Sequence, residues 1–235
     1  MALEDIVSAG FSELGIEVDE KAVERLRIYY DFLVQQNQVM NLTAITGEAD
    51  AARLHFLDCA EIIKQKDVSG LSIADVGTGA GFPGMVLKIL CPDIRLTLLD
   101  SLDKRIGFLR ELCDRLGFDD VSAIHCRAEE APSQLRGTFD IVTSRAVARL
   151  NVLSELCLPL VKSGGVFLAM KGPDYDAELN EAKTAIKLLG GRVDDAVSYT
   201  IPGTDVTHSI ITVKKLSETP SKYPRRWAQI KKQPL

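Results

Sequence analysis

The chain has few residues of the kinds that build disulfide frameworks or metal sites. Its 235 residues include five cysteines and three histidines, and no two cysteines form a C-x-x-C pair. The cysteines are odd in number, widely spaced and mostly inside apolar periodic stretches, so we interpret them as reduced core residues in a reducing compartment. Zinc sites and disulfide scaffolds are therefore not expected, and we predict no metal.

The chain also lacks the features of a membrane anchor or a secretory leader. No apolar run approaches the roughly 20 residues of a membrane span, and the first residues lack a basic region followed by an apolar one. With 46% apolar and 26% charged residues, the composition is that of one globular domain with appendages. We therefore expect a cytoplasmic monomer that binds no membrane.

The chain also has no overall excess of basic residues, which argues at first against a nucleic-acid partner. The formal net charge is −5, but residues 204–235 carry seven Lys and Arg against two acidic residues, while residues 1–203 carry a net −10. A basic end on an acidic body is compatible with an anionic polymer as partner. A solvated C-terminus explains the same count, and both interpretations stay open at this point.

Hydrophobic periodicity divides the chain into an N-terminal helical extension (1–70), an α/β domain (71–216) and a basic, extended C-terminal tail (217–235). In the middle part short apolar runs alternate with amphipathic segments, which predicts a mostly parallel, Rossmann-like sheet with helices on both faces. The last two β-like runs predict an antiparallel hairpin at the sheet edge. The expected strands are 71–76, 95–100, 121–126, 139–146, 166–171, 192–201 and 206–216, and the expected helices between them are 83–90, 102–116, 151–161 and 177–189.

The most informative segment is the glycine-rich turn at residues 75–84, which joins the first predicted strand to a helix. Gly77, Gly79 and Gly81 allow positive φ and let the backbone approach a bound molecule. Pro83 suits the first turn of the helix, whose N-terminal amides favour a carboxylate or a phosphate. We therefore expect a nucleotide-like ligand here, where the loops after the parallel strands converge.

An acidic residue ends the second predicted strand, 23 residues after Gly77. A carboxylate at Asp100 can accept hydrogen bonds from both hydroxyls of a ribose, which indicates an adenosine-bearing cofactor. Ser101, the next residue, is expected to contact the same cofactor. The alternative is that Asp100 caps the helix that starts at Leu102. Residues 128–130 follow the third strand and are expected to close over the adenine.

Two enzyme classes use this layout. Residues 79–84 satisfy G-x-G-x-x-G, so an NAD-dependent dehydrogenase is one candidate, although a lone match of this motif is weak. Three features favour S-adenosylmethionine: Asp75 two positions before the first glycine, the third glycine at Gly81, and a hairpin in place of a sixth parallel strand. Asp75 is expected to face the positively charged amino-acid part of this cofactor through water or backbone groups.

The chain strongly resembles the small-subunit ribosomal RNA guanine-N7 methyltransferases, also called glucose-inhibited division protein B. The resemblance rests on residues 41–45, 55–58, 75–84, 99–101, 104–105, 128–130, 144–148, 171–172 and 219–225. It implies a class I S-adenosylmethionine-dependent methyltransferase fold, with cofactor contacts at Gly77, Phe82, Ala128, Glu129 and Arg145. The implied substrate is a guanine, position 527 by the family's name, in a loop of 16S ribosomal RNA, either free or in the small subunit. Leu54, Cys59, Ala60 and Ala228 depart from the family's usual residues, which concerns RNA docking rather than the cofactor site.

The expected chemistry needs no general base, because guanine N7 has an in-plane lone pair and loses no proton when it is methylated. Rate enhancement then comes from orientation, an effect of up to ~7–11 kcal/mol. Arg145 is the expected catalytic residue, facing guanine O6, a phosphate or the cofactor carboxylate; the alternative is a structural ion pair with a nearby acid. His55 and Asp58 are interpreted mainly as structural. The residues expected to contact RNA phosphates are Lys171, Lys222, Arg225 and Arg226.

Two other functions fit the same motifs. One is a methyltransferase that acts on a small molecule or a protein, and the other is a nucleotide-binding ribosome assembly factor without enzymatic activity. The first predicts that deletion of residues 217–235 leaves activity intact, whereas an RNA substrate predicts its loss. The second predicts that the protein still functions in cells with Gly79→Asp, whose side chain should fill the pocket.

Overall fold

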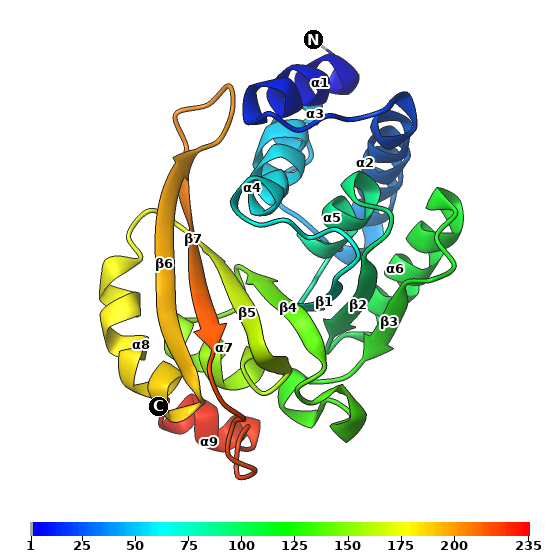
Figure 1. Cartoon of the computed structure of the whole chain (residues 1–235). Coiled ribbons are helices and arrows are strands. Elements are labelled where there is room, and N and C mark those ends of the chain that lie inside the picture. The colour runs from blue at the N-terminus through cyan, green and yellow to red at the C-terminus, as the bar shows by residue number, and fades with distance from the viewer. Residues whose placement is uncertain (1) are drawn as a thin grey trace.

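The computed structural model describes residues 2–235 and places the strands in one seven-stranded sheet (Figure 1). The strand order is β3-β2-β1-β4-β5-β7-β6, in which β7 runs antiparallel to both neighbours and the other pairs are parallel. The strands are β1 (Ser72–Val76), β2 (Arg95–Asp100), β3 (Ser122–His125), β4 (Phe139–Arg145), β5 (Val161–Lys171), β6 (Gly191–Thr200) and β7 (Thr207–Lys215). The predicted fold class, a mostly parallel sheet with an antiparallel C-terminal hairpin, is confirmed.

Helices cover both faces of the sheet, and the central strands are therefore apolar on both sides. Successive side chains of a strand point to opposite faces. Accordingly Ile73 and Ile141 belong to one buried cluster, whereas their neighbours Ala74 and Val142 belong to the other. The helices of the α/β domain are α5 (Gly84–Leu90), α6 (Asp103–Leu116), α7 (Leu150–Cys157) and α8 (Asp176–Leu188), with 3-10 turns at Ala128–Glu130 and Ser133–Leu135.

The largest difference from the predicted boundaries lies between α7 and β5. The helix expected over 151–161 ends at Cys157, and β5 begins at Val161, five residues before the predicted start. The first part of β5 contains Gly164 and Gly165, which hide the strand pattern in the sequence because glycine is depleted in strands.

The N-terminal extension is helical, as predicted. Its elements are α1 (Leu3–Leu14), α2 (Glu20–Met40), α3 (Glu48–Ala51), a π-helical stretch (Ala52–Leu57) and α4 (Asp58–Gln65). Asp19 caps α2, since its side chain accepts a hydrogen bond from the Ala22 amide at 2.7 Å.

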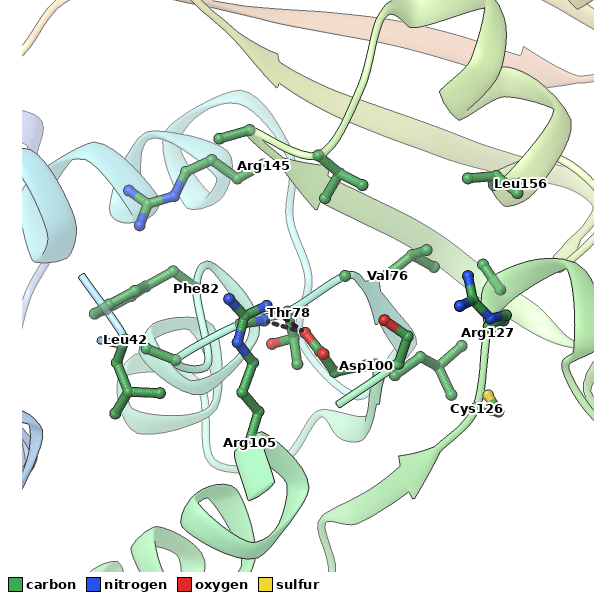
Figure 2. Close-up of a pocket in the computed structure, with 18 of the residues that line it drawn as sticks. Leu42, Val76, Thr78, Phe82, Asp100, Arg105, Cys126, Arg127, Arg145 and Leu156 are labelled. Carbon is green, nitrogen blue, oxygen red and sulfur yellow. Dashed lines mark hydrogen bonds and ion pairs between the residues drawn. The ribbon is translucent and has the colours of Figure 1, made fainter. Parts of the chain in front are cut away.

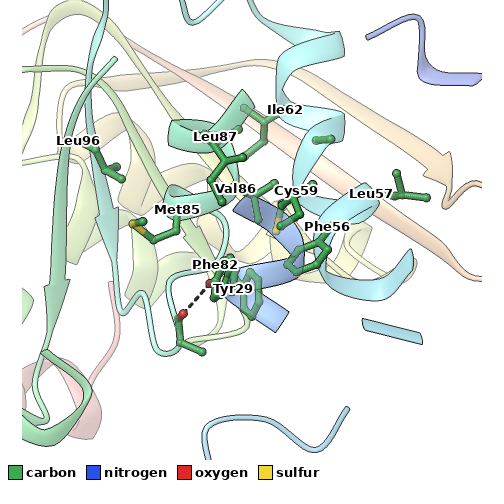
Figure 3. Close-up of a cluster of buried hydrophobic side chains, with 14 of the residues drawn as sticks. Tyr29, Phe56, Leu57, Cys59, Ile62, Phe82, Met85, Val86, Leu87 and Leu96 are labelled. Carbon is green, nitrogen blue, oxygen red and sulfur yellow. Dashed lines mark hydrogen bonds between the residues drawn. The ribbon is translucent and has the colours of Figure 1, made fainter. Parts of the chain in front are cut away.

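The extension shares its core with the sheet instead of forming a separate one. Tyr29 of α2 and Phe56 pack with Phe82 and Met85 in the same buried cluster (Figure 3). The Tyr29 hydroxyl donates a hydrogen bond to the carbonyl oxygen of Ala80 at 2.6 Å. The extension therefore packs against the glycine turn and stabilises its conformation.

The C-terminal segment was expected to be extended, and this is wrong for six of its residues. Trp227–Lys232 form a short helix, α9, whose Ile230 is fully buried against the face of the sheet that α7 and α8 cover. Upstream, Arg136 donates hydrogen bonds to the carbonyl oxygens of Thr219 and Tyr223 at 2.6 and 2.7 Å. Such tertiary contacts, and not local propensity, decide the conformation of so short a helix.

Within residues 2–235, no helix is long and apolar enough to cross a membrane. The same part of the chain contains no cluster of three or more His, Cys, Asp or Glu side chains suited to a metal ion.

Candidate active site

A cavity of about 470 Å³ opens at the carboxyl ends of the parallel strands, where the strand order reverses between β1 and β4. This is the position where open α/β sheets bind ligands. The loops after β1, β2 and β3 converge there, as expected, and segments from both ends of the chain complete the wall. Lining residues include Leu42, Thr43, His55, Gly77, Gly79, Phe82, Asp100, Ser101, Arg105, Arg127, Ala128, Glu129, Arg145, Leu156 and Trp227.

The three predicted glycines all have positive φ, between 61° and 105°. Gly77 and Gly79 line the cavity, and a Cβ on Gly79 would meet nothing within 4 Å, so the backbone there is open to a ligand. Gly81 serves the turn differently, because a Cβ there would come within 2.7 Å of the Tyr29 hydroxyl. Pro83 occupies the position just before α5 rather than its first turn.

Asp75 lies behind the turn and is not among the residues that line the cavity. Its Oδ2 accepts hydrogen bonds from the Thr78 hydroxyl at 2.7 Å and the Gly84 amide at 2.8 Å. Its Oδ1 has no partner within residues 2–235. Burial raises the pKa of Asp75 to about 6, although these two hydrogen bonds oppose the shift. In this structure Asp75 fixes the shape of the turn.

Asp100 is 3% exposed and lies at the middle of the cavity (Figure 2). Its Oδ2 accepts hydrogen bonds from the Gly79 amide at 2.9 Å and from Arg105 at 3.4 Å, and its Oδ1 accepts one from the Leu102 amide at 2.9 Å. Both sequence interpretations are thus compatible, since the carboxylate tethers the start of α6 and also faces the glycine turn. Within residues 2–235 Oδ1 accepts only one hydrogen bond, and it has further acceptor capacity for a ribose hydroxyl.

Ala128 and Glu129 line the cavity from the 3-10 turn after β3. The Oε1 atom of Glu129 is buried and has no hydrogen-bond partner within residues 2–235. A buried acceptor without a partner is costly, so this atom is suited to a donor on a ligand, such as the exocyclic amino group of adenine.

Arg145, at the end of β4, is held by three groups of the N-terminal extension. Its guanidinium donates to Asp58 at 3.0 Å, to the Leu54 carbonyl oxygen at 3.1 Å and to Nδ1 of His55 at 3.1 Å. It also lies 4.8 Å above the centre of the Phe82 ring. The structure therefore shows the ion pair that was the alternative interpretation of Arg145, at the wall of the cavity.

Phe82, which the resemblance implies as a cofactor contact, has a ring that other side chains already cover. His55 stacks on it with a centroid distance of 4.4 Å, and Tyr29 stacks on it at 5.2 Å. Phe82 is 5% exposed and contributes to the wall mainly through packing.

His55 is neutral. Because the Arg145 guanidinium can only donate, Nδ1 of His55 is the acceptor, and Nε2 carries the proton and donates to the Thr43 hydroxyl at 2.9 Å. Burial, reinforced by the charge of Arg145, lowers the pKa of His55 to about 3. Both ring nitrogens are therefore engaged.

Asp58 connects the extension to the C-terminal hairpin. It is fully buried, and its Oδ1 accepts from the Tyr199 hydroxyl and lies 2.8 Å from Nδ1 of His208, while its Oδ2 pairs with Arg145. Burial opposes its ionisation, but the hydrogen bond from His208 and the charge of Arg145 lower the pKa of Asp58. Sequence reasoning missed Tyr199 and His208, because a separation of about 150 residues leaves no local signal.

Of the four predicted RNA-binding residues, two form ion pairs within the described part of the protein and two do not. Lys171 donates to the Ala148 carbonyl oxygen and pairs with Glu178, both at 2.6 Å, and Arg225 pairs with the fully buried Glu155. In contrast, Lys222 and Arg226 are exposed and form no ion pair within residues 2–235.

Comparison with known proteins identifies the family to which this architecture belongs. Residues 22–205 match the GidB family, described as rRNA small subunit methyltransferase G. The chain belongs to this family. The chain is 47% identical over 238 residues to "Ribosomal RNA small subunit methyltransferase G" of Alkaliphilus oremlandii, with 100% of both chains covered. The protein of the same name from Lachnoclostridium phytofermentans is 46% identical, with 96% of this chain and 95% of that one covered.

Solved structures of lower similarity share the fold. The crystal structure of M. jannaschii TYW2 in complex with AdoMet superimposes with a TM-score of 0.55 at 14% identity, covering 68% of this chain and 77% of that one. The resemblance predicted from the sequence is confirmed, and the chain is a methyltransferase of an S-adenosylmethionine-dependent family. The dehydrogenase interpretation of the glycine motif is wrong.

Proposed function

We propose that this protein transfers a methyl group from S-adenosylmethionine to guanine N7, at position 527 by the family's name, in a loop of 16S ribosomal RNA, without a general base. Family membership supports an rRNA substrate of the small subunit. The observation that carries the finer proposal is that the polar side chains around Arg145 are already paired with one another, which leaves none of them free to take a proton.

The residues present fit the cofactor. The cavity of about 470 Å³ offers a carboxylate for the ribose at Asp100, an open glycine backbone at Gly79, and a buried acceptor for adenine at Glu129. When bound, the cofactor supplies an electrophilic methyl group on a positively charged sulfur. The chain's own contribution is to hold and orient the two reactants and to exclude water.

The residues near Arg145 are unsuited to remove a proton. His55 has both ring nitrogens engaged and a pKa of about 3, and Asp58 accepts from three side chains. A reaction that requires deprotonation of its nucleophile would find no acceptor there. Methylation of guanine N7 has no such requirement.

Methylation also places a positive charge on the guanine ring, so an unpaired cation beside it would oppose the reaction. The ion pair with Asp58 neutralises Arg145. Arg145 can therefore donate hydrogen bonds at the wall of the cavity without carrying an uncompensated charge into it. Because A-form RNA hides the major-groove edge on which N7 lies, the target base must be unstacked in a loop.

The test is to incubate the protein with labelled S-adenosylmethionine and small subunits that lack the modification. We expect label in 16S ribosomal RNA at a single guanine, and strand cleavage at that guanine after reduction and aniline treatment, which is specific for N7-methylguanine. Absence of label, under conditions in which a control enzyme labels the same particles, would contradict the proposed substrate. Label without aniline cleavage would contradict N7 as the acceptor.

A further inference from the structure

The cavity has two chemically different ends, with Asp100 between them (Figure 2). Leu42, Phe82 and Arg145 lie at one end, near the glycine turn. Leu156 and the residues after β3, Cys126 and Arg127, gather at the other end. If Asp100 holds a ribose, the amino-acid part of the cofactor extends along the glycine turn, and the adenine enters the second end.

The C-terminal segment reaches this second end. Trp227, the first residue of α9, is one of the residues that line the cavity, as is Leu156 of α7. Ile230 of α9 belongs to the buried cluster that also contains Leu156, and Ala128 packs against that cluster. Trp227 therefore lines the same cavity as Glu129, whose Oε1 atom is unpaired within the described residues, and its helix packs with the cluster that Ala128 contacts.

The position of Trp227 is fixed from both sides. Two residues before it, Arg225 forms three hydrogen bonds with the buried carboxylate of Glu155, through its backbone amide at 2.8 Å, Nε at 2.8 Å and Nη2 at 2.6 Å. Three residues after it, Ile230 is fully buried. Glu155 precedes Leu156 on α7, so this ion pair ties Trp227 to the same helix that supplies the apolar wall.

We propose that Trp227 is a cofactor-binding residue, which contacts the adenine of S-adenosylmethionine and closes the end of the cavity with Leu156. Trp227 is 37% exposed, so it retains free surface for a ligand. An aromatic wall beside a buried acceptor suits adenine, which has a π-face and an exocyclic amino donor. This inference rests on the proposed cofactor, and it assigns the C-terminal segment a role at the cofactor site instead of a role limited to RNA phosphates.

Because Trp227 is the only tryptophan of the chain, its fluorescence reports on this contact directly. We expect the emission of the full-length protein to change on titration with S-adenosylhomocysteine, and also with methylthioadenosine, which retains the adenosine. Methionine alone should leave the emission unchanged. A response to methionine without one to methylthioadenosine would overturn the inference, because the indole would then face the other end of the ligand.

Variants supply the energetic test. Trp227→Ala should weaken S-adenosylhomocysteine binding about tenfold by calorimetry, since stacking of a base on an aromatic side chain contributes about 1–3 kcal/mol, which is about 5- to 150-fold in affinity. Trp227→Phe should retain most of the affinity. Gln229→Ala, on an exposed position of the same helix that does not line the cavity, is the matched control and should bind like the parent chain.

The outcomes separate this inference from the proposed function. If the parent chain binds S-adenosylhomocysteine but its emission does not change and Trp227→Ala binds equally well, the inference is wrong and the cofactor assignment stands. If emission changes only when small subunits are added, Trp227 belongs to the RNA interface and the inference is again wrong. If the parent chain does not bind S-adenosylhomocysteine at all, the proposed function itself fails.

Discussion

Two regions outside the α/β domain complete the cavity, and they are attached in different ways. The N-terminal extension contributes Leu42, Thr43 and His55, and the C-terminal segment contributes Trp227. The extension brings several helices whose apolar residues merge with the core on one face of the sheet. The C-terminal segment buries few side chains, among them Tyr223 and Ile230, on the other face.

Each region is joined to the domain by one buried carboxylate paired with an arginine. In the extension the acid is Asp58 and the arginine, Arg145, belongs to β4. In the C-terminal segment the arrangement is reversed, because Arg225 comes from the segment and Glu155 from α7. Breaking the two pairs should therefore have different consequences, because a region that shares a large core with the sheet stays attached, whereas a short segment with few buried side chains can detach.

Loss of the Asp58 carboxylate should have the largest effect. Asp58→Ala leaves Arg145 buried without its counter-ion, and the extension cannot detach to hydrate it, so we expect the free energy of unfolding to fall by about 3–5 kcal/mol in urea denaturation. Glu111→Ala is the control, because it removes an exposed i,i+4 partner of Arg115 and should change stability by less than about 1 kcal/mol. A fall in the free energy of unfolding of less than about 1 kcal/mol for Asp58→Ala would contradict the expectation that buried Arg145 depends on this counter-ion.

Asp75 provides the contrasting case of a buried carboxyl without an ion-pair partner. Its pKa is about 6 in the folded chain against 3.8 for the ordinary carboxyl, so its contribution to stability is fully present below pH 3.8 and is lost as pH rises to about 6. The expected loss is about 3 kcal/mol. Asp75→Asn should remove this component, which is read as the difference between the two unfolding curves measured from pH 4 to pH 7. Parallel curves would show that Asp75 does not titrate in this range.

Breaking the second ion pair should release only the C-terminal segment. In Arg225→Ala the detached segment exposes Glu155 to water, which limits the cost, so we expect the global unfolding free energy to change by about 1 kcal/mol. Trypsin should then cleave rapidly within residues 217–235, and S-adenosylhomocysteine affinity should fall as in Trp227→Ala. Arg226→Ala, at the exposed neighbouring position, should remain resistant to cleavage. Unfolding of the whole domain in Arg225→Ala would show that the segment is part of the core.

The exposed cations of the C-terminal segment should have the smallest effect, limited to RNA. The double variant Lys222→Ala/Arg226→Ala should weaken binding to small subunits several-fold and reduce the slope of log affinity against log salt by up to about 2. Cofactor affinity should not change. Lys183→Ala, an exposed lysine of α8, is the control. An unchanged salt slope in the double variant would place the RNA elsewhere on the surface.

Features with a local physical signature were predictable. The positive φ values at Gly77, Gly79 and Gly81 follow from the glycine residues themselves. The mostly parallel sheet and its antiparallel C-terminal hairpin follow from the alternation of apolar runs and amphipathic segments. The helix at Trp227–Lys232 was not predictable, because it depends on burial of Ile230 and on the pair between Arg225 and Glu155. Likewise, nothing in the sequence indicates that Lys171 is engaged by Glu178.

The sheet, the glycine turn, the acid at the end of β2 and the family could all be predicted from the sequence alone. These depend on periodicity and on residues close together in the chain, where backbone conformation and side-chain type act directly. The partner of each buried charge depends on contacts between distant parts of the chain. These contacts neutralise Arg145 by Asp58 and, through Arg225, fix Trp227 at the cavity. A buried charge requires a counter-ion close in space, and that counter-ion can be far away in the sequence. The separation is 87 residues for Arg145 and Asp58 and 70 residues for Arg225 and Glu155.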